Sequence, residues 1–330
     1  MFGVLPKKNM RVLVTGAGSR IGQAVIKLIK KFNKKHFIIT TDYFKDSVGF
    51  YWTNNYELLP DILSCEIKVW LNALEKIITK YKVELIIPGV DFELPYFSKY
   101  KLYLESKYNL KCLISPEEQI GLFNDKYLTY KFLVDNNINA PKTFLLDEYK
   151  LHSKKIKFPV LIKPRVGSTS KGILQINNLN ELKKLKLNSK KFIIQEKLNG
   201  FEVTSGAVIF NKKIYSLINL KRNLKNGNTH SASLYKNKTI DNYIKKIIKV
   251  ANFYGPINFQ LFIYKNKPNL IEINPRFSGT SFSRSLFGLN EYKIVYSVIF
   301  KKNLNPKFKI KTGSVIKYIE DLFINKDKLI

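Results

Sequence analysis

Apolar and polar residues alternate along the first part of the chain in blocks that suit strands and helices in turn. Short apolar runs that predict buried strands lie at residues 11–15, 37–41 and 84–88, and stretches with helical periodicity lie at 24–32 and 70–81. Strands that alternate with crossover helices are typical of a parallel sheet. We therefore predict an α/β first unit that ends near residue 115.

The pattern changes beyond residue 115, where short strands become frequent. We expect helices at residues 125–136 and 240–253, and strands at 158–163, 192–195, 202–210, 213–220, 257–264 and 269–274. Residues 265–267 separate the last two strands and predict a hairpin connection. The second half of the chain therefore suits an α+β arrangement that differs from the first unit.

Charge and cysteine content narrow the function classes. The 330-residue chain carries a formal net charge of +32, but its lysines are spread along the whole length and no recognisable nucleic-acid-binding module accompanies them. A solvated surface is the favoured interpretation, and a basic nucleic-acid-binding protein stays an alternative. The two cysteines, Cys65 and Cys112, cannot form a disulfide framework and lack zinc-site spacing. Without a long apolar run or a signal-like start, we expect a cytoplasmic protein.

A glycine-rich turn follows the first predicted strand. Glycines at such a turn let the backbone approach a phosphate, and Asp42 stands where a dinucleotide fold places its ribose-binding acid. The turn, with Arg20 in place of a glycine, resembles the cofactor turn of short-chain dehydrogenases, and Tyr127 and Lys131 have the spacing of their tyrosine and lysine. An NAD(P)-dependent oxidoreductase is therefore an alternative. The favoured interpretation is a turn that caps the first helix and shapes a substrate pocket.

Lys163 ends a predicted strand and precedes a turn rich in glycine and hydroxyl side chains. Such a turn suits nucleotide phosphates, because the lysine supplies a point charge and the glycines free backbone N–H groups to point inward. The turn contains Gly167, Ser168, Thr169, Ser170 and Gly172. An ordinary surface hairpin with a half-buried lysine is the alternative.

The strand predicted at residues 192–195 passes from apolar to polar residues. Its continuation through Leu198 suits an adenine site, in which the backbone would bond the base edge and Leu198 would pack on its face. Glu202 would then accept hydrogen bonds from the ribose hydroxyls. A plain strand followed by an exposed acid is the alternative.

Two strands near residues 257–274 carry polar side chains at every second position. Asn258 and Gln260 share one face of the first strand, and Glu272 and Asn274 share one face of the second. If the strands pair as a hairpin, these faces coincide and present oxygen ligands to a hard cation such as Mg²⁺. Arg276 follows directly, where its guanidinium would reach a phosphoryl group or a substrate carboxylate.

The order of these motifs resembles the ATP-grasp superfamily, and in particular single-copy relatives of the carbamoyl phosphate synthetase large subunit. The motifs are Asn-Asp-Lys ending at Lys126, Lys163 before its turn, Gln-Glu-Lys-Leu at residues 195–198 with Glu202, Asn-Phe-Gln ending at Gln260, and Glu-Ile-Asn-Pro-Arg at residues 272–276. The resemblance implies a Rossmann-like domain at residues 1–115, linking helices and a lid subdomain at 116–198, and a larger antiparallel-sheet subdomain at 199–330.

The resemblance also implies an ATP- and Mg²⁺-dependent ligase, with Mn²⁺ as a possible substitute, that activates a carboxylate as an acyl phosphate and transfers it to an amine. Small-molecule substrates and a homodimer are expected, without a membrane. ATP would contact Lys126, Lys163, Gly167, Ser168, Thr169, Ser170, Gly172, Gln195, Glu196, Lys197, Leu198, Glu202 and Arg222. The metal would bind Gln260, Glu272 and Asn274, with Arg276 and Lys163 catalytic, and the substrate would contact Gly18, Ser19, Arg20, Asp91, His230, Ser278 and Gly279.

Overall fold

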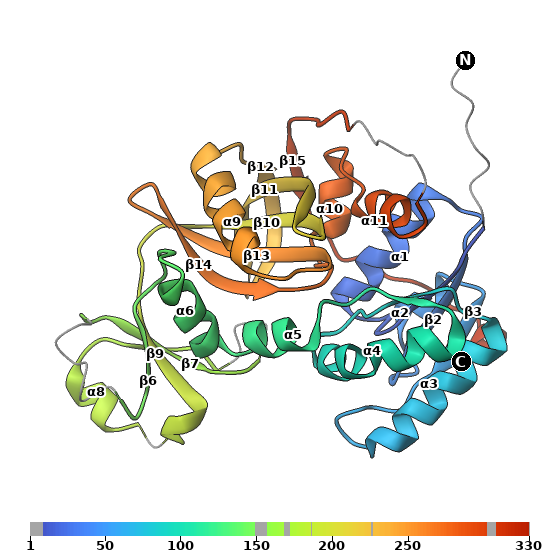
Figure 1. The fold of residues 1–330 in the computed structure, drawn as a ribbon, viewed down its shortest axis with the longest axis horizontal. Coiled ribbons are helices and arrows are strands. Elements are labelled where there is room, and N and C mark those ends of the chain that lie inside the picture. The colour runs from blue at the N-terminus through green and yellow to red at the C-terminus, as the bar shows by residue number, and fades with distance from the viewer. Residues whose placement is uncertain are drawn as a thin grey trace.

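The computed structural model describes residues 9–148, 157–167, 172–185, 187–225, 227–301 and 308–329. Three sheets follow one another along these residues, with five, four and six strands in chain order. Figure 1 shows the small four-stranded sheet at one end of the molecule, below the large antiparallel sheet, and the parallel sheet at the other end. The α/β and α+β organisation expected from the sequence is confirmed, whereas the division into domains at residues 115 and 198 stays a prediction.

The first sheet is parallel and has the strand order β3-β2-β1-β4-β5. Its strands are β1 (Arg11–Val14), β2 (Phe37–Asp42), β3 (Asn55–Leu58), β4 (Leu85–Ile87) and β5 (Lys111–Cys112). Its helices are α1 (Arg20–Phe32), α2 (Val48–Tyr51), α3 (Ile67–Tyr81) and α4 (Leu94–Tyr108), with the short η1 (Asp91–Glu93) before α4. The central strands are buried as continuous apolar runs, as the two covered faces of a parallel sheet require.

The second sheet is antiparallel, with the order β6-β9-β7-β8. It consists of β6 (Thr143–Leu145), β7 (Val160–Pro164), β8 (Leu174–Ile176) and β9 (Phe192–Glu196), with α8 (Leu179–Lys183) and η3 (Ser189–Lys191) beside it. Two helices, α5 (Glu117–Asn124) and α6 (Lys126–Asp135), lead into it. A small apolar core of its own, which includes Val160, Ile162 and Ile194, holds this sheet together.

The third sheet is antiparallel and has the order β14-β13-β10-β11-β12-β15. Its strands are β10 (Phe201–Phe210), β11 (Lys213–Lys225), β12 (Asn228–Leu234), β13 (Gly255–Tyr264), β14 (Lys267–Asn274) and β15 (Ser314–Ile316). Its helices are α9 (Lys238–Val250), α10 (Ser281–Leu286), α11 (Glu291–Ile299) and the short η4 (Lys326–Lys328). The amphipathic α9 covers one face, because its buried isoleucines join the core formed by β10 and β13.

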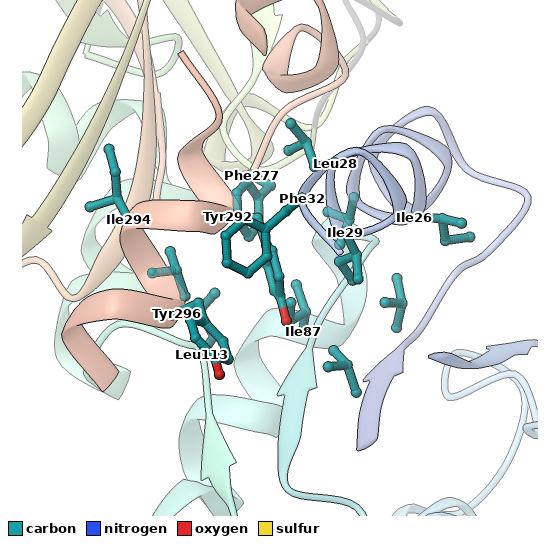
Figure 2. Packing of buried hydrophobic residues seen from close by; sticks show 14 of the residues in the cluster. Ile26, Leu28, Ile29, Phe32, Ile87, Leu113, Phe277, Tyr292, Ile294 and Tyr296 are labelled. Carbon is teal, nitrogen blue, oxygen red and sulfur yellow. The ribbon is translucent and has the colours of Figure 1, made fainter. Parts of the chain in front are cut away.

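One apolar core joins the parallel sheet to the large sheet. Figure 2 shows Phe32 of α1 against Tyr292 and Tyr296 of α11, with Ile87 of the parallel sheet and Leu113 nearby. The ring centroids of Phe32 and the two tyrosines lie 5.7 and 5.3 Å apart, in edge and tilted arrangements that aromatic pairs favour. Because these side chains are buried together, the two sheets pack as one body.

A buried ion pair orders the chain between β14 and α11. Arg284 and Glu291 are 1% and 0% exposed, and Nε and Nη2 of the arginine lie 2.6 and 3.1 Å from the two carboxylate oxygens. The guanidinium also donates to the hydroxyls of Ser278, Thr280 and Ser281 at 2.8–3.1 Å. A Cβ on Gly206 of β10 would lie 2.2 Å from the arginine Nε, so only glycine leaves room for this pair.

Several element boundaries differ from the sequence prediction. Helix α1 begins at Arg20, because the Ser19 side chain caps it by accepting from the Gly22 N–H. The β13–β14 hairpin has a two-residue turn, Lys265 and Asn266, both with positive φ, so residue 267 belongs to β14. The sequence pattern also missed six strands with at most one buried residue each: β3, β5, β6, β8, β12 and β15. Within the described part of the chain, no helix combines the length and apolar character that crossing a bilayer requires.

The Glu291→Gln substitution is expected to lower the free energy of unfolding by about 3–5 kcal/mol, because it leaves the Arg284 charge buried without a full counter-charge. Urea unfolding followed by circular dichroism measures this loss. The matched control is Glu57→Gln, which breaks the exposed ion pair with Lys80 and should cost about 1 kcal/mol or less. Equal losses in the two variants would contradict the role of the buried pair.

Candidate active site

The β13–β14 hairpin brings together the polar side chains that the alternating pattern placed on common faces. Asn258 lies opposite Asn274, and Gln260 lies opposite Glu272. Directly opposed residues of an antiparallel pair point to the same side of the sheet. The register therefore collects carboxylate and amide oxygens on one face, next to a bulge that follows Gln260. Asn258 differs from the others, because its Oδ1 accepts from the Thr204 hydroxyl at 2.8 Å.

The donor set of this face fits a magnesium ion that also binds phosphate oxygens. Burial raises the pKa of Glu272, while the positive charges of Lys126 and Arg276 lower it in part, so the carboxylate lacks full compensation. The buried Nδ2 of Asn274 has no partner among the described residues, and as an N–H donor it suits a phosphate oxygen rather than the metal itself. Among those residues no three acidic, histidine or cysteine side chains gather. One carboxylate with two amides suits Mg²⁺, which keeps water or substrate oxygens as further ligands.

Two lysines converge on the same face from the second sheet and its leading helix. Lys163 of β7 is buried, and its Nζ donates to Gln195 Oε1 at 2.7 Å. Burial, and then the nearby charge of Lys126, lower the pKa of Lys163 to about 8, against the opposing effect of Glu272 and Glu202. Burial likewise lowers the pKa of Lys126. Desolvated ammonium groups of this kind are stabilised by an anion.

The position of Lys126 depends on an ion pair that the sequence analysis did not identify. Asp125 caps α6 by accepting from the backbone N–H groups of residues 127 and 128. The same carboxylate accepts from Arg165 Nε and Nη2 at 3.0 and 2.6 Å. Lys126, the first residue of α6, also donates to the Gly167 carbonyl at 2.6 Å. The aspartate before Lys126 was a recognisable helix cap, but its partner Arg165 lies 40 residues away in the sequence.

The turn after β7 is described only in part. Gly167 and Gly172 both have positive φ, which glycine adopts without strain, and a side chain on Gly167 would meet no other atom. Ser168, Thr169 and Ser170 lie outside the described residues. The proposed contact of this turn with nucleotide phosphates therefore stays a prediction.

The predicted adenine segment leaves the second sheet where β9 ends at Glu196. The Gln195 side chain is buried, and its Nε2 donates to Thr143 at 2.8 Å while its oxygen accepts from Lys163. Lys197 is exposed and bonds to Gln175, and Leu198 is half-buried in the connection to β10. Gln195 thus positions the lysine from within the sheet, whereas the adenine contacts of residues 196–198 stay a prediction.

The predicted ribose acid is held by an arginine of the neighbouring strand. Arg222 of β11 forms an ion pair with Glu202 of β10 and donates to Gln260 Oε1 at 3.3 Å. Its Nη1 donates to the Thr229 hydroxyl at 3.2 Å. Arg222 therefore links the Glu202 carboxylate to the metal face, and its charge lies beside both.

Arg276 is held by an acid of the first unit. Its Nε and Nη2 donate to the Asp91 carboxylate at 2.6 and 3.0 Å, and Nη2 also donates to Asn274 Oδ1 at 3.1 Å. The pair spans the junction between η1 and the end of β14. The predicted substrate residue Asp91 and the predicted catalytic residue Arg276 therefore lie in one bonded group with a predicted metal ligand.

The remaining predicted substrate residues divide into two kinds. The polar groups of Gly18, Ser19 and Ser278 satisfy other protein groups: the Gly18 N–H donates to Asp42, and the Ser19 hydroxyl donates to a backbone carbonyl while capping α1. Ser278 belongs to the hydrogen-bonded group around the buried arginine. In contrast, Arg20 and His230 are exposed, and Gly279 is half-buried against the Arg20 side chain.

The glycine turn of the first unit is closed by its own neighbours. The Asp42 carboxylate accepts from the Gly18 N–H at 2.8 Å and from the Ser47 hydroxyl at 3.0 Å. A Cβ on Gly16 would lie 2.5 Å from the Val90 side chain, so the glycine serves packing within the turn. Tyr127 belongs to α6 and bonds to Glu148. These contacts favour the interpretation of a structural turn over that of a nicotinamide site.

Glu93 lies beneath this turn and gives the first unit a pH-dependent stability. Its carboxyl is fully buried and accepts from the Thr15 hydroxyl, and burial raises its pKa to about 8. The raised value means that the folded protein holds a proton that the unfolded chain has released above its ordinary pKa of 4.5. The stability contribution is complete below that ordinary value and is lost as the pH rises toward 8.

Glu93→Gln should remove this pH dependence, since an amide mimics the protonated carboxyl and does not titrate. We expect the free energy of unfolding of the wild type to fall by at least about 2 kcal/mol more than that of the variant between pH 5 and pH 8. Urea titrations at several pH values measure the difference. Parallel pH profiles for the two proteins would show that Glu93 titrates normally.

Comparison with known proteins adds sequence relatives and structural neighbours. The ATP-grasp domain family matches residues 123–280. The uncharacterized protein MG011 of Mycoplasma genitalium is 31% identical over 59% of this chain and 70% of its own length. The carbamoyl phosphate synthase large chain of a Thermoanaerobacter species is 26% identical over 53% of this chain and 18% of its own length. The match to the MG011 homologue of Mycoplasma pneumoniae covers 57% of that relative.

The structural neighbours support the same fold. The L-amino acid ligase of Bacillus licheniformis superimposes with a TM-score of 0.69 at 13% identity, covering 93% of this chain and 78% of that one. The N5-carboxyaminoimidazole synthetase of Staphylococcus aureus, solved with ADP, has a TM-score of 0.66 at 17% identity and covers 86% of this chain and 75% of that one. At these identities the likeness is one of fold.

Proposed function

This chain belongs to the ATP-grasp superfamily, and on that basis we propose that it is an ATP-dependent ligase that joins a carboxylate to an amine. The observation that carries the proposal is the convergence of Lys126, Lys163 and Glu272 at one face, where Lys126 and Glu272 shift each other's pKa and both shift the pKa of Lys163. Two desolvated cations next to a carboxylate that is only partly compensated form a complementary site for a nucleoside triphosphate together with a divalent cation.

The first step would transfer the γ-phosphoryl group of ATP to the substrate carboxylate. A carboxylate oxygen attacks phosphorus, the bond to the β-phosphate oxygen breaks, and ADP leaves as an acyl phosphate forms. Lys126 and Lys163 would hold the phosphate oxygens, and Arg276, oriented by Asp91, would face the charge that develops on the transferred group. Catalysis would rest mainly on positioning and electrostatics, because phosphoryl transfer needs little covalent help from the protein.

Gln260, Glu272 and Asn274 would hold magnesium, which, when bound, would neutralise charge on the phosphate oxygens. Glu202 and Arg222 would position the ribose side of the nucleotide, since the arginine already fixes the carboxylate beside Gln260. In the second step the amine nitrogen would attack the acyl carbon, releasing inorganic phosphate and a proton and forming an amide. The use of Mn²⁺, a homodimeric assembly and a cytoplasmic location stay predictions.

Glu272→Gln tests the proposal, because it keeps the shape of the side chain and removes the carboxylate charge that the metal requires. We expect ATP with magnesium to raise the Tm of the wild type and to raise that of the variant far less, with nucleotide affinity at least about ten-fold weaker. Differential scanning fluorimetry with and without magnesium measures both effects.

The matched control is Glu181→Gln, at a half-buried acid of α8 whose carboxylate accepts from Asn177 and Asn178, and it should respond to the nucleotide like the wild type. Stabilisation of the wild type by NAD or NADP instead of magnesium ATP would overturn the proposed function in favour of an oxidoreductase. An unchanged magnesium response in Glu272→Gln would remove this residue from the metal site.

A further inference from the structure

A group of cations lies next to the proposed site, and it consists of Arg20, Lys27, Arg222, Arg284 and Lys317. Lys317 comes from the C-terminal segment. Strand β15 pairs with β12 at the edge of the large sheet, as the red strand beside β12 in Figure 1 shows. The next residue, Lys317, continues the pairing through its backbone N–H, which donates to the His230 carbonyl at 2.8 Å. The pairing of β15 therefore determines where the Lys317 side chain begins.

The Lys317 ammonium group points toward the loop that the buried ion pair orders. Its Nζ donates to the Gly279 carbonyl at 2.6 Å. A Cβ on Gly279 would lie 3.3 Å from Arg20 Cβ and 3.9 Å from Lys317 Nζ, so the two cationic side chains flank the same glycine. Arg20 donates in turn to the Asn228 side chain of β12. Three distant parts of the chain thus bring two cations to one place.

The charges in this group are only partly balanced. Arg284 and Arg222 have ion-pair partners, Glu291 and Glu202. No described acid forms an ion pair with Arg20 or Lys317. Burial, and then Arg20, Arg222, Arg284 and Lys27, lower the pKa of Lys317 to about 8. The folded chain therefore carries an electrostatic cost here that a bound anion would offset.

The position of Arg20 is also unfavourable without a ligand. Arg20 is the first residue of α1, where the helix dipole is positive, and the first turn of this helix contains no acid. Lys27, one of the other cations of the group, is accommodated differently, because its Nζ lies 4.5 Å from the centre of the Trp52 ring. A cation at the start of a helix, beside a second partly buried cation, is suited to an anionic ligand.

The cation group adjoins the nucleotide side of the site. Asn228, which accepts from Arg20, is followed by Thr229, whose hydroxyl accepts from Arg222 Nη1 at 3.2 Å. The other end of the Arg222 guanidinium contacts Gln260 of the proposed metal face. A molecule that reached from Arg20 and Lys317 toward Arg222 would therefore approach the phosphoryl group that Lys126 and Lys163 hold in the proposed reaction.

We propose that Arg20 and Lys317 bind a second, non-reacting anionic group of the carboxylate substrate, which is a carboxylate or a phosphate. The substrate would then carry at least two anionic groups, one activated by ATP and one held at the start of α1 by the C-terminal segment. This assignment rests on the proposed function. It makes β15 and Lys317 part of the substrate site rather than a terminal extension of the sheet.

Anion binding at this place can be measured without knowing the whole substrate. The full chain is saturated with magnesium and a non-hydrolysable ATP analogue, which occupies the phosphoryl position, and is then titrated with inorganic phosphate or with malonate at constant ionic strength. We expect a saturable rise in Tm with at least one of the two anions, and the stronger one indicates a phosphate or a dicarboxylate substrate. In Lys317→Met and in Arg20→Met the midpoint should rise about ten-fold or more.

Two control variants separate the binding site from general effects. Lys311→Met removes an exposed lysine of the same C-terminal segment and should leave the anion response unchanged. Lys317→Arg keeps the charge, so anion binding by this residue predicts that most of the anion response is retained. A purely structural role of the lysine predicts that the response is lost in Lys317→Arg as it is in Lys317→Met. Each variant is compared with its own Tm without anion, so a lower starting stability does not affect the result.

The outcomes also separate this inference from the proposed function. If the magnesium nucleotide stabilises the wild type but neither anion does, or if Lys317→Met and Lys311→Met respond alike, the second anion site is wrong while the ligase proposal stands. If the magnesium nucleotide itself gives no stabilisation, the proposed function fails first. The site is supported if the anion response is weakened by about ten-fold or lost in Lys317→Met and Arg20→Met but not in Lys311→Met.

Discussion

The Arg284–Glu291 ion pair is the interaction on which the arrangement of the site depends. Both side chains are almost fully buried, so each would carry a large desolvation cost without the other. The cost is offset because the guanidinium also satisfies three hydroxyls of the loop after β14. The pair therefore orders residues 278–281, joins α10 to the start of α11, and requires a glycine at position 206. Through α11 it is connected to the aromatic core that packs against α1.

Three further ion pairs hold charged groups in place at the site itself. Asp91 holds Arg276, Asp125 holds Arg165 near Lys126, and Glu202 is held by Arg222. Each pair joins residues from different elements, so the charged groups are positioned before a ligand arrives. Preorganisation of this kind matters for phosphoryl chemistry, because charges that are already oriented need no reorganisation as the transition state forms. The second sheet contributes Lys163 and the large sheet contributes Glu272, which explains why the face they share lies at the junction of the two.

The sequence predicted the family, the fold class and most strands of this protein, and the comparisons and the structure confirm them. The success at the β13–β14 hairpin has a simple cause, since a two-residue period and a short turn determine which side chains meet. The roles of the individual site residues stay predictions. What the sequence did not reveal are contacts between distant residues: Asp91 with Arg276, 185 positions apart, and Lys317 with Gly279. No local pattern marks such a pair. Strand β3 was missed because it lies at the edge of the sheet and none of its four residues is buried.

The large positive charge becomes informative only when the solvation of each cation is considered. Most lysines are exposed and are hydrated, which costs the fold little. Burial lowers the pKa of Lys101 as well, but that side chain lies 3.9 Å from the Tyr254 ring and donates to a backbone carbonyl, so it is stabilised within the protein. Lys126, Lys163 and Lys317 are also desolvated, yet other cations lie beside two of them and their hydrogen bonds go to neutral oxygens. A desolvated ammonium group whose hydrogen bond goes to a neutral oxygen retains part of its desolvation cost until an anion binds. These three lysines, rather than the net charge, mark where this protein is expected to hold its anionic ligands.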